Sequence, residues 1–127
     1  MIMTKREKII YWVATIWLAL GMTTTGLLQI IQFEEQLEVM RHLGYPDYFS
    51  SILGTWKVLG VIAILVPGYP LIKEWAYAGY FFAMSGAIVS HVVAEDPASE
   101  FIGSSLLVVL TIVSWYFRPD SRTLRAR

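Results

Sequence analysis

SILGTWKVLGVIAIL, residues 51–65, is the stretch that decides the fold of this chain. It is apolar enough to lie in the hydrocarbon core of a membrane, yet it contains one charged residue, Lys57. A charge at such depth is costly, and it usually faces protein or a water-filled cavity rather than lipid. The stretch therefore predicts a membrane-spanning helix, and the other apolar segments should supply partners for Lys57.

The composition of the whole chain is also that of a membrane protein. Of its 127 residues, 56% are hydrophobic and only 16% are charged, whereas about 25% of a typical soluble domain is charged. The net charge is zero, so nothing indicates nucleic-acid binding. The chain has no cysteine, which excludes disulfides, thiolate metal sites and thiol chemistry by this chain alone.

Three further apolar segments predict helices that span the membrane with this one. The first is long enough to cross a hydrocarbon core of about 30 Å and longer than the ~7–15-residue core of a secretory signal, so we expect it to be retained. Short links favour antiparallel neighbours. We therefore expect an all-α, up-down-up-down four-helix bundle that forms one domain over residues 1–127. The four predicted spans cover residues 9–31, 49–66, 75–94 and 101–117.

The segment between the first two spans, FEEQLEVMRHLGYPDYF, is too charged to cross a membrane. Leu37, Met40 and Leu43 can share one side of a short helix. Gly44 is a favourable residue just after a helix end, and Pro46 follows as a chain breaker. We expect a short amphipathic helix that lies at the membrane interface or caps the bundle.

The basic residues predict the orientation of the chain. With four crossings, the side that holds both termini carries eight basic residues, and the opposite loops carry only Arg41. Loops rich in lysine and arginine stay in the cytoplasm, so both termini should be cytoplasmic. The eight residues are Lys5, Arg6, Lys8, Lys73, Arg118, Arg122, Arg125 and Arg127.

Several polar residues of the predicted spans fall at similar depth in the outer half of the bundle. The candidates for lining a ligand pocket are Thr25, Gln29, Lys57, His91, Ser104 and Ser105, and the candidates at its rim are Glu34 and Glu95. In the first hypothesis these residues form a pocket, open to the outer side, for an anionic or polar small molecule or a quinone headgroup. It predicts a cavity that touches both Lys57 and His91, with His91 as hydrogen-bond donor or proton relay.

Two other hypotheses for Lys57 remain open. It can belong to a polar network that holds the helices in register, paired with Glu34 or Glu95. It can also extend to the outer interface by snorkelling and face nothing in particular.

Other polar and small residues have structural explanations. Lys73 is expected to contact lipid headgroups at the cytoplasmic turn, and Glu74 to favour the positive end of a helix dipole. Gly79, Ala83 and Ala87 form a small-residue ridge that lets another helix approach, within the chain or in a dimer.

The sequence indicates neither a metal site nor a catalytic residue. His42 and His91 are not connected by an HxxE or HxxxH pattern, and zinc usually has three or four ligands at recognisable spacing. No Ser-His-Asp arrangement can be argued, and the glycines form neither GxGxxG nor a P-loop. An enzyme acting on its own is therefore not indicated, and no cofactor is evident from the residues.

Residues 43–97 carry motifs that resemble the DoxX-like family of small four-helix membrane proteins. These motifs are LGYP, ILGxxKxLG with a proline after it, KEWAYAG and a late SH, in the family's order and spacing. The resemblance implies a multi-pass protein of the bacterial inner membrane. It singles out the motif positions Gly54, Lys57, Gly60, Pro67, Lys73, Glu74, Tyr77, Gly79 and His91.

The resemblance also suggests functions. The wider DoxX/DoxD grouping is named from a subunit of a thiosulfate:quinone oxidoreductase, and some relatives are linked to thiol-redox complexes. We therefore expect a protein of the lipid bilayer that binds a small molecule or quinone, or serves as the membrane subunit of a redox-linked complex with a partner protein. The alternative is a non-catalytic scaffold or assembly subunit. A transporter is least favoured, because no internal repeat is visible.

Overall fold

A computed structural model describes residues 4–119, 122 and 123, and these residues form a bundle of helices. Within them there is no strand, which confirms the predicted all-α class. The elements in chain order are α1 (Lys5–Ile30), α2 (Glu34–His42), α3 (Asp47–Leu65), α4 (Pro70–Val93), the 3₁₀-helix η1 (Ala98–Glu100) and α5 (Ile102–Tyr116).

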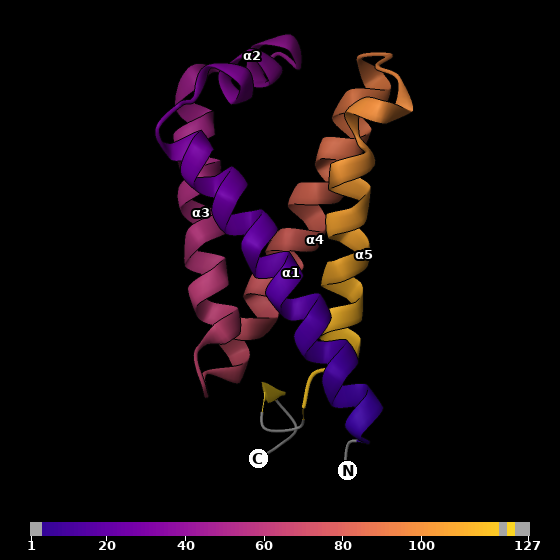
Figure 1. Ribbon diagram of the computed structural model, residues 1–127. Helices are drawn as coiled ribbons and strands as arrows, with labels where there is room; N and C mark the ends of the chain where they lie inside the picture. Colours follow the sequence, from indigo (N-terminus) through magenta and orange to yellow (C-terminus); the bar gives the residue numbers. More distant parts are fainter. Residues whose placement is uncertain (1–3, 120–121, 124–127) are drawn as a thin grey trace.

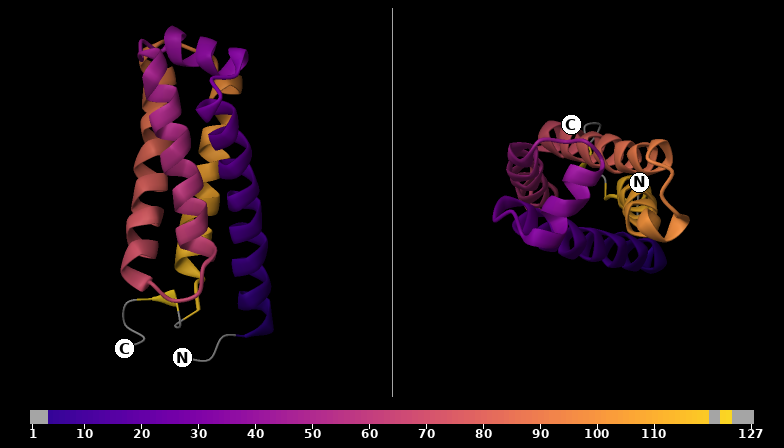
Figure 2. Two further views of the ribbon diagram at one scale, coloured as in Figure 1. Left: turned by 90° about the vertical axis from the view of Figure 1, so that its left-hand side faces the viewer. Right: turned by 90° about the horizontal axis from the view of Figure 1, so that it is seen from above.

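The four longer helices are arranged in a ring, each packed against two neighbours. α1 contacts α3 and α5, and α4 contacts the same two helices. The start of α1, the turn between α3 and α4, and the end of α5 lie at the lower end in Figure 1, whereas α2 and η1 lie at the upper end. Seen from above, α2 crosses the end of the ring (Figure 2).

The helices change neighbours along the length of the bundle. At the upper end α1 lies beside α3 and α4 lies beside α5, and the two pairs stand apart (Figure 1). Toward the lower end α1 crosses over to α5. The buried apolar core is made mainly by α1 and α4, with contributions from α3 and α5: Ala14, Leu18, Met22, Val61, Ile64, Tyr77, Tyr80, Met84 and Leu110.

The outside of the bundle is apolar. Large side chains such as Trp56, Trp75 and Phe82 are exposed on α3 and α4. Three helices, α1, α3 and α4, are long and apolar enough to cross a membrane, and α5 is a shorter apolar helix of 15 residues. A surface of this kind is unusual in a monomeric soluble protein and is typical of helices that face lipid.

The boundaries of the four long helices lie within two residues of those expected, except at the starts of α1 and α4; α1 begins at Lys5 rather than near residue 9. The expected amphipathic helix is α2, and it ends just before Gly44, whose φ is +90°. α4 begins at Pro70 rather than near residue 75. Proline suits the first position of a helix because its φ is already helical and its missing N–H is not needed there. The basic residues Arg125 and Arg127 lie outside the described residues.

Candidate functional site

Lys57 lies in the middle of α3, inside the bundle. Its side chain is only 5% exposed. The ammonium Nζ donates to Thr25 Oγ1 of α1 over 3.1 Å, and the Thr25 hydroxyl in turn donates to the Gly21 carbonyl over 2.9 Å. Lys57 therefore bonds to the neighbouring helix rather than extending to the outer interface.

Two glycines of the ILGxxKxLG motif allow other helices to approach on either side of Lys57. A Cβ atom at Gly54 would lie 2.4 Å from the Gly26 carbonyl oxygen of α1. A Cβ atom at Gly60 would lie 2.6 Å from Tyr80 Oη of α4. Tyr80 Oη donates to the Lys57 carbonyl over 2.5 Å. The motif thus places α1 and α4 in direct contact with the two faces of α3.

A cavity of about 380 Å³ lies between α3 and α4 and reaches Lys57. Small residues leave this space open, since the cavity is bordered by Gly60, Ala63, Ala76, Gly79 and Ala83. A Cβ atom at Gly79 would have no neighbour within 4 Å. The predicted ridge of small residues therefore lines a cavity along part of its length.

The surroundings of this cavity differ from the pocket expected from the sequence. Its walls are almost entirely apolar, and the exposed Trp56 and Trp75 flank it on the outside of the bundle. His91 is not among its lining residues. The cavity that touches Lys57 thus lies on the outer surface of the bundle between two helices, where a membrane protein meets lipid.

The other pocket candidates of α1 and α5, Gln29, Ser104 and Ser105, do not line this cavity. Gln29, 4% exposed, follows Thr25 by one turn, and its Oε1 has no hydrogen-bond partner in the described part of the chain. Ser105 donates to the Phe101 carbonyl of its own helix over 2.9 Å, a common bond for a helical serine. Ser104 is half-buried.

The rim candidates do not pair with the lysine. Glu34 and Glu95 are exposed. In residues 4–119, 122 and 123, neither forms an ion pair with Lys57.

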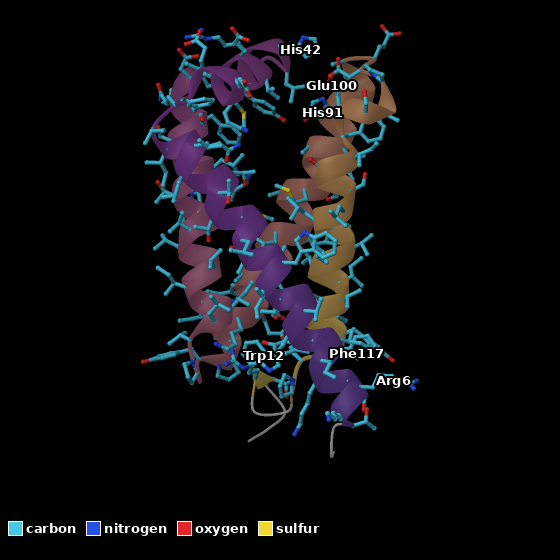
Figure 3. All side chains as sticks on the ribbon, viewed as in Figure 1. Arg6, Trp12, His42, His91, Glu100 and Phe117 are labelled. Atoms are coloured by element: carbon cyan, nitrogen blue, oxygen red, sulfur yellow. The ribbon has the colours of Figure 1, made fainter. Side chains whose placement is uncertain are left out.

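His91 belongs to a different cluster, at the upper end of the bundle. Its Nδ1 lies 2.8 Å from Asp96 Oδ2, and His42 Nε2 at the end of α2 lies 2.7 Å from Asp96 Oδ1. Figure 3 shows His42 and His91 together at this end. The hydrogen bond with His91, and then that with His42, hold the pKa of Asp96 below its ordinary value.

The remaining family-motif residues stabilise the lower end of the bundle. Lys73 is buried and donates to the carbonyls of Ala63 and Val66 at the end of α3, so it does not contact headgroups as expected. Pro67 follows directly after this helix end. Glu74 lies in the second turn of α4, and its Oε1 pairs with Arg118 Nη2 over 2.5 Å.

Tyr77 joins a chain of buried hydroxyl groups in the same region. Its Oη lies 2.8 Å from Ser114 Oγ of α5, which lies 2.6 Å from Thr15 Oγ1 of α1. These bonds tie three helices together.

Sequence reasoning missed several of these contacts. It did not single out Asp96, which joins both histidines, or Tyr45, whose hydroxyl lies 2.7 Å from Ser90 Oγ. It also missed Ser50, which donates to the Gln29 carbonyl over 2.9 Å. The one available signal was that Tyr45 and Ser90 belong to the LGYP and SH motifs. In the part of the chain that the structure describes, no group of three or more His, Asp or Glu side chains is placed to hold a metal ion.

The comparisons with known proteins agree with the motifs. The model of the DoxX-like family matches residues 13–114, which include Lys57, His91 and the cavity between α3 and α4. Neither the search of curated proteins nor that of solved structures gave a significant match. Together with its three long apolar helices, the match shows that this chain is a membrane protein of the DoxX-like family.

Proposed function

We propose that this protein binds a quinone-class molecule in the cavity between α3 and α4, with a quinone carbonyl oxygen at the Lys57 ammonium. The observation that carries the proposal is that Lys57 is buried and borders this cavity, and that its ammonium makes one hydrogen bond, to Thr25, within the described residues. An ammonium group has three donors. Two of them remain for a ligand.

The cavity suits a molecule that is apolar along most of its length. Apart from Lys57, its walls consist of small, aliphatic and aromatic residues, such as Gly79, Leu59 and Trp56. A buried charge in a membrane is costly unless it finds hydrogen-bond acceptors. A quinone supplies acceptors at its head and a long apolar tail, and because the cavity lies on the outside of the bundle, such a ligand would enter from the bilayer.

The proposal includes a topology. α1, α3, α4 and α5 would each cross the bacterial inner membrane in up-down-up-down order, with both termini in the cytoplasm. The basic residues support this orientation because Lys5, Lys73 and Arg118 all belong to the segments at the lower end of the bundle. α5 has 15 residues and is about 22 Å long at 1.5 Å per residue, so the bilayer would thin locally around it.

A quinone-binding membrane protein fits the role of a subunit in a redox-linked complex. The chain has no cysteine, so a partner protein would carry out any thiol chemistry. This chain would position the quinone in the membrane for that partner.

Fluorescence quenching tests the proposal directly. Quinones quench tryptophan, and Trp56 and Trp75 flank the cavity. The protein in lipid nanodiscs is titrated with a short-chain ubiquinone and a short-chain menaquinone. We expect Lys57→Met to weaken binding about tenfold or more, because loss of a charged hydrogen bond costs about 1.5–3 kcal/mol.

A matched pair of variants separates cavity binding from general partition into lipid. Gly79→Leu fills the cavity, and Gly86→Leu adds the same side chain to α4 away from it; a Cβ atom fits at either glycine. We expect Gly79→Leu to abolish the saturable quenching and Gly86→Leu to retain it. Equal saturable binding by both variants, or by Lys57→Met and wild type, would contradict the proposal.

The alternative function is a scaffold whose polar residues only hold the helices together. The hydrogen bond from Lys57 to Thr25, which joins α3 to α1, favours it. Lys57→Met would then lower the unfolding temperature while no quinone binds saturably to the wild type. A scaffold should also stay bound to its partner during purification in mild detergent, so that native mass spectrometry detects the complex. A stable lone monomer would argue against a scaffold.

A further inference from the structure

α2 is preceded by one residue with a positive φ angle and followed by another. Gln32, before α2, has φ of +55°, and Gly44, after it, has φ of +90°. Each is a single residue in the left-handed region, where the chain changes direction sharply. α2 is therefore a short helix between two tight bends, at the upper end of the bundle (Figure 1).

One side of α2 is fastened to the α1–α3 pair. Leu37 and Met40 are buried, and α2 packs on both helices. Arg41 makes a two-pronged ion pair with Asp47 at the start of α3, with Nε to Oδ1 at 2.9 Å and Nη2 to Oδ2 at 2.8 Å. Gln32 Nε2 donates to the Asp47 carbonyl over 3.2 Å. These contacts keep α2 with α3.

The end of α2 and the turn after it reach across to α4 instead. His42, the last residue of α2, bonds to Asp96, which follows α4 and also bonds to His91. Tyr45 bonds to Ser90 near the end of α4. The adjacent residues Arg41 and His42 thus bind opposite sides of the bundle.

The other hydrogen bonds between the two halves lie lower in the bundle. Thr15 bonds to Ser114, and Tyr80 bonds to the Lys57 carbonyl. Lys73 bonds to the last turn of α3. In the described ranges, no hydrogen bond above the level of Lys57 joins the two helix pairs except those of His42 and Tyr45. The pairs also stand apart at this end (Figure 1).

We propose that α2 is a hinged strap that closes the upper, outer end of the bundle, and that the bonds of His42 to Asp96 and of Tyr45 to Ser90 are its latch. The His42 side chain of the latch is 56% exposed, so its bond competes with water. By contrast, the buried side chains of Leu37 and Met40 hold α2 to the α1–α3 pair. When the latch breaks, the α1–α3 pair carries α2 away from α4, and the outer end of the bundle opens. This inference does not depend on the proposed quinone.

Distance measurements between two spin labels test the strap. The chain has no cysteine, so Glu38→Cys on α2 and Ser99→Cys on η1 label only those positions, both of which are exposed. Pulsed electron spin resonance in nanodiscs then reports the distance between α2 and η1. We expect the double variant His42→Ala/Tyr45→Phe, which removes both latch bonds, to shift the distribution to longer and broader distances.

Arg41→Ala is the matched control, because it breaks the neighbouring bond to α3 and leaves the latch intact. Asp96→Asn, a milder change, should give part of the shift if the double variant folds poorly. Unchanged distances in both latch variants, or an equal shift with Arg41→Ala, would overturn the inference. A change in the wild-type distance on adding EDTA would also overturn it, since the cluster would then hold a metal rather than act as a direct latch.

Discussion

A Cβ atom placed on Gly54 would lie 2.4 Å from the carbonyl oxygen of Gly26, so α1 and α3 touch through their backbones at this point. This contact has consequences for the site nearby. Thr25 and Lys57 lie next to the crossing, and the close approach of the two helices brings their polar atoms to 3.1 Å. Both glycines lie inside helices with ordinary helical φ angles, so the backbone conformation does not require glycine here. Glycine is needed because a side chain would not fit between the two helices.

Gly54→Ala should therefore destabilise the protein although alanine is the better helix former. Forcing a methyl group into a packed contact costs about 1–3 kcal/mol. We expect a lower midpoint in thermal unfolding in detergent, followed by circular dichroism. Gly79→Ala is the control, because its methyl group would have no neighbour within 4 Å. If the two variants unfold at the same temperature, α1 and α3 do not pack closely at Gly54.

Gly60 and Tyr80 should behave as a coupled pair. A Cβ atom at Gly60 would lie 2.6 Å from Tyr80 Oη and 2.7 Å from two ring carbons. We expect Gly60→Ala alone to destabilise by about 1–3 kcal/mol, and the smaller side chain of Tyr80→Leu to relieve part of that loss in the double variant. A double-mutant cycle in denaturant measures the coupling. Strictly additive effects would show that the two residues do not meet.

Lys73 should be important for stability rather than for lipid contact. It is 1% exposed, and its ammonium satisfies the Ala63 and Val66 carbonyls at the end of α3. Lys73→Met removes these bonds and leaves buried acceptors unpaired, which costs about 1–3 kcal/mol. Thermal unfolding should show this loss, whereas Lys5→Met, at an exposed position, should leave the midpoint unchanged. Similar midpoints for the two would contradict the capping role.

The cluster around Asp96 predicts how stability depends on pH. The hydrogen bonds with His91 and His42 hold its pKa below the ordinary value of 3.8. A carboxyl group with a lowered pKa stabilises the fold above its unfolded value, and this contribution is lost as the pH falls through the folded value. The difference in unfolding midpoint between wild type and Asp96→Asn should thus be present at pH 5 and shrink only below about 3.8. A difference that persists undiminished at pH 2 would refute this linkage.

Local sequence features were sufficient to predict the helices. The lengths of the apolar runs gave the long helices, and the charges and Gly44 gave α2 and its end. The start of α4 was predicted five residues too late, at residue 75 rather than Pro70, although proline is well suited to a helix start. The charge and the ILGxxKxLG motif drew attention to Lys57, but the sequence left open a ligand pocket, a structural polar network and snorkelling.

The amino-acid sequence by itself determined that this protein is a DoxX-like membrane protein with a charge in its third helix. Hydrophobic length and periodicity are properties of each segment alone, so they can be read without the fold. Only the tertiary structure decided that Thr25 bonds to Lys57, that Asp96 joins two histidines and that Lys73 is buried. Those outcomes depend on how helices far apart in the chain rotate and cross, and small residues such as Gly54 and Gly60 set those crossings by letting backbones and side chains approach.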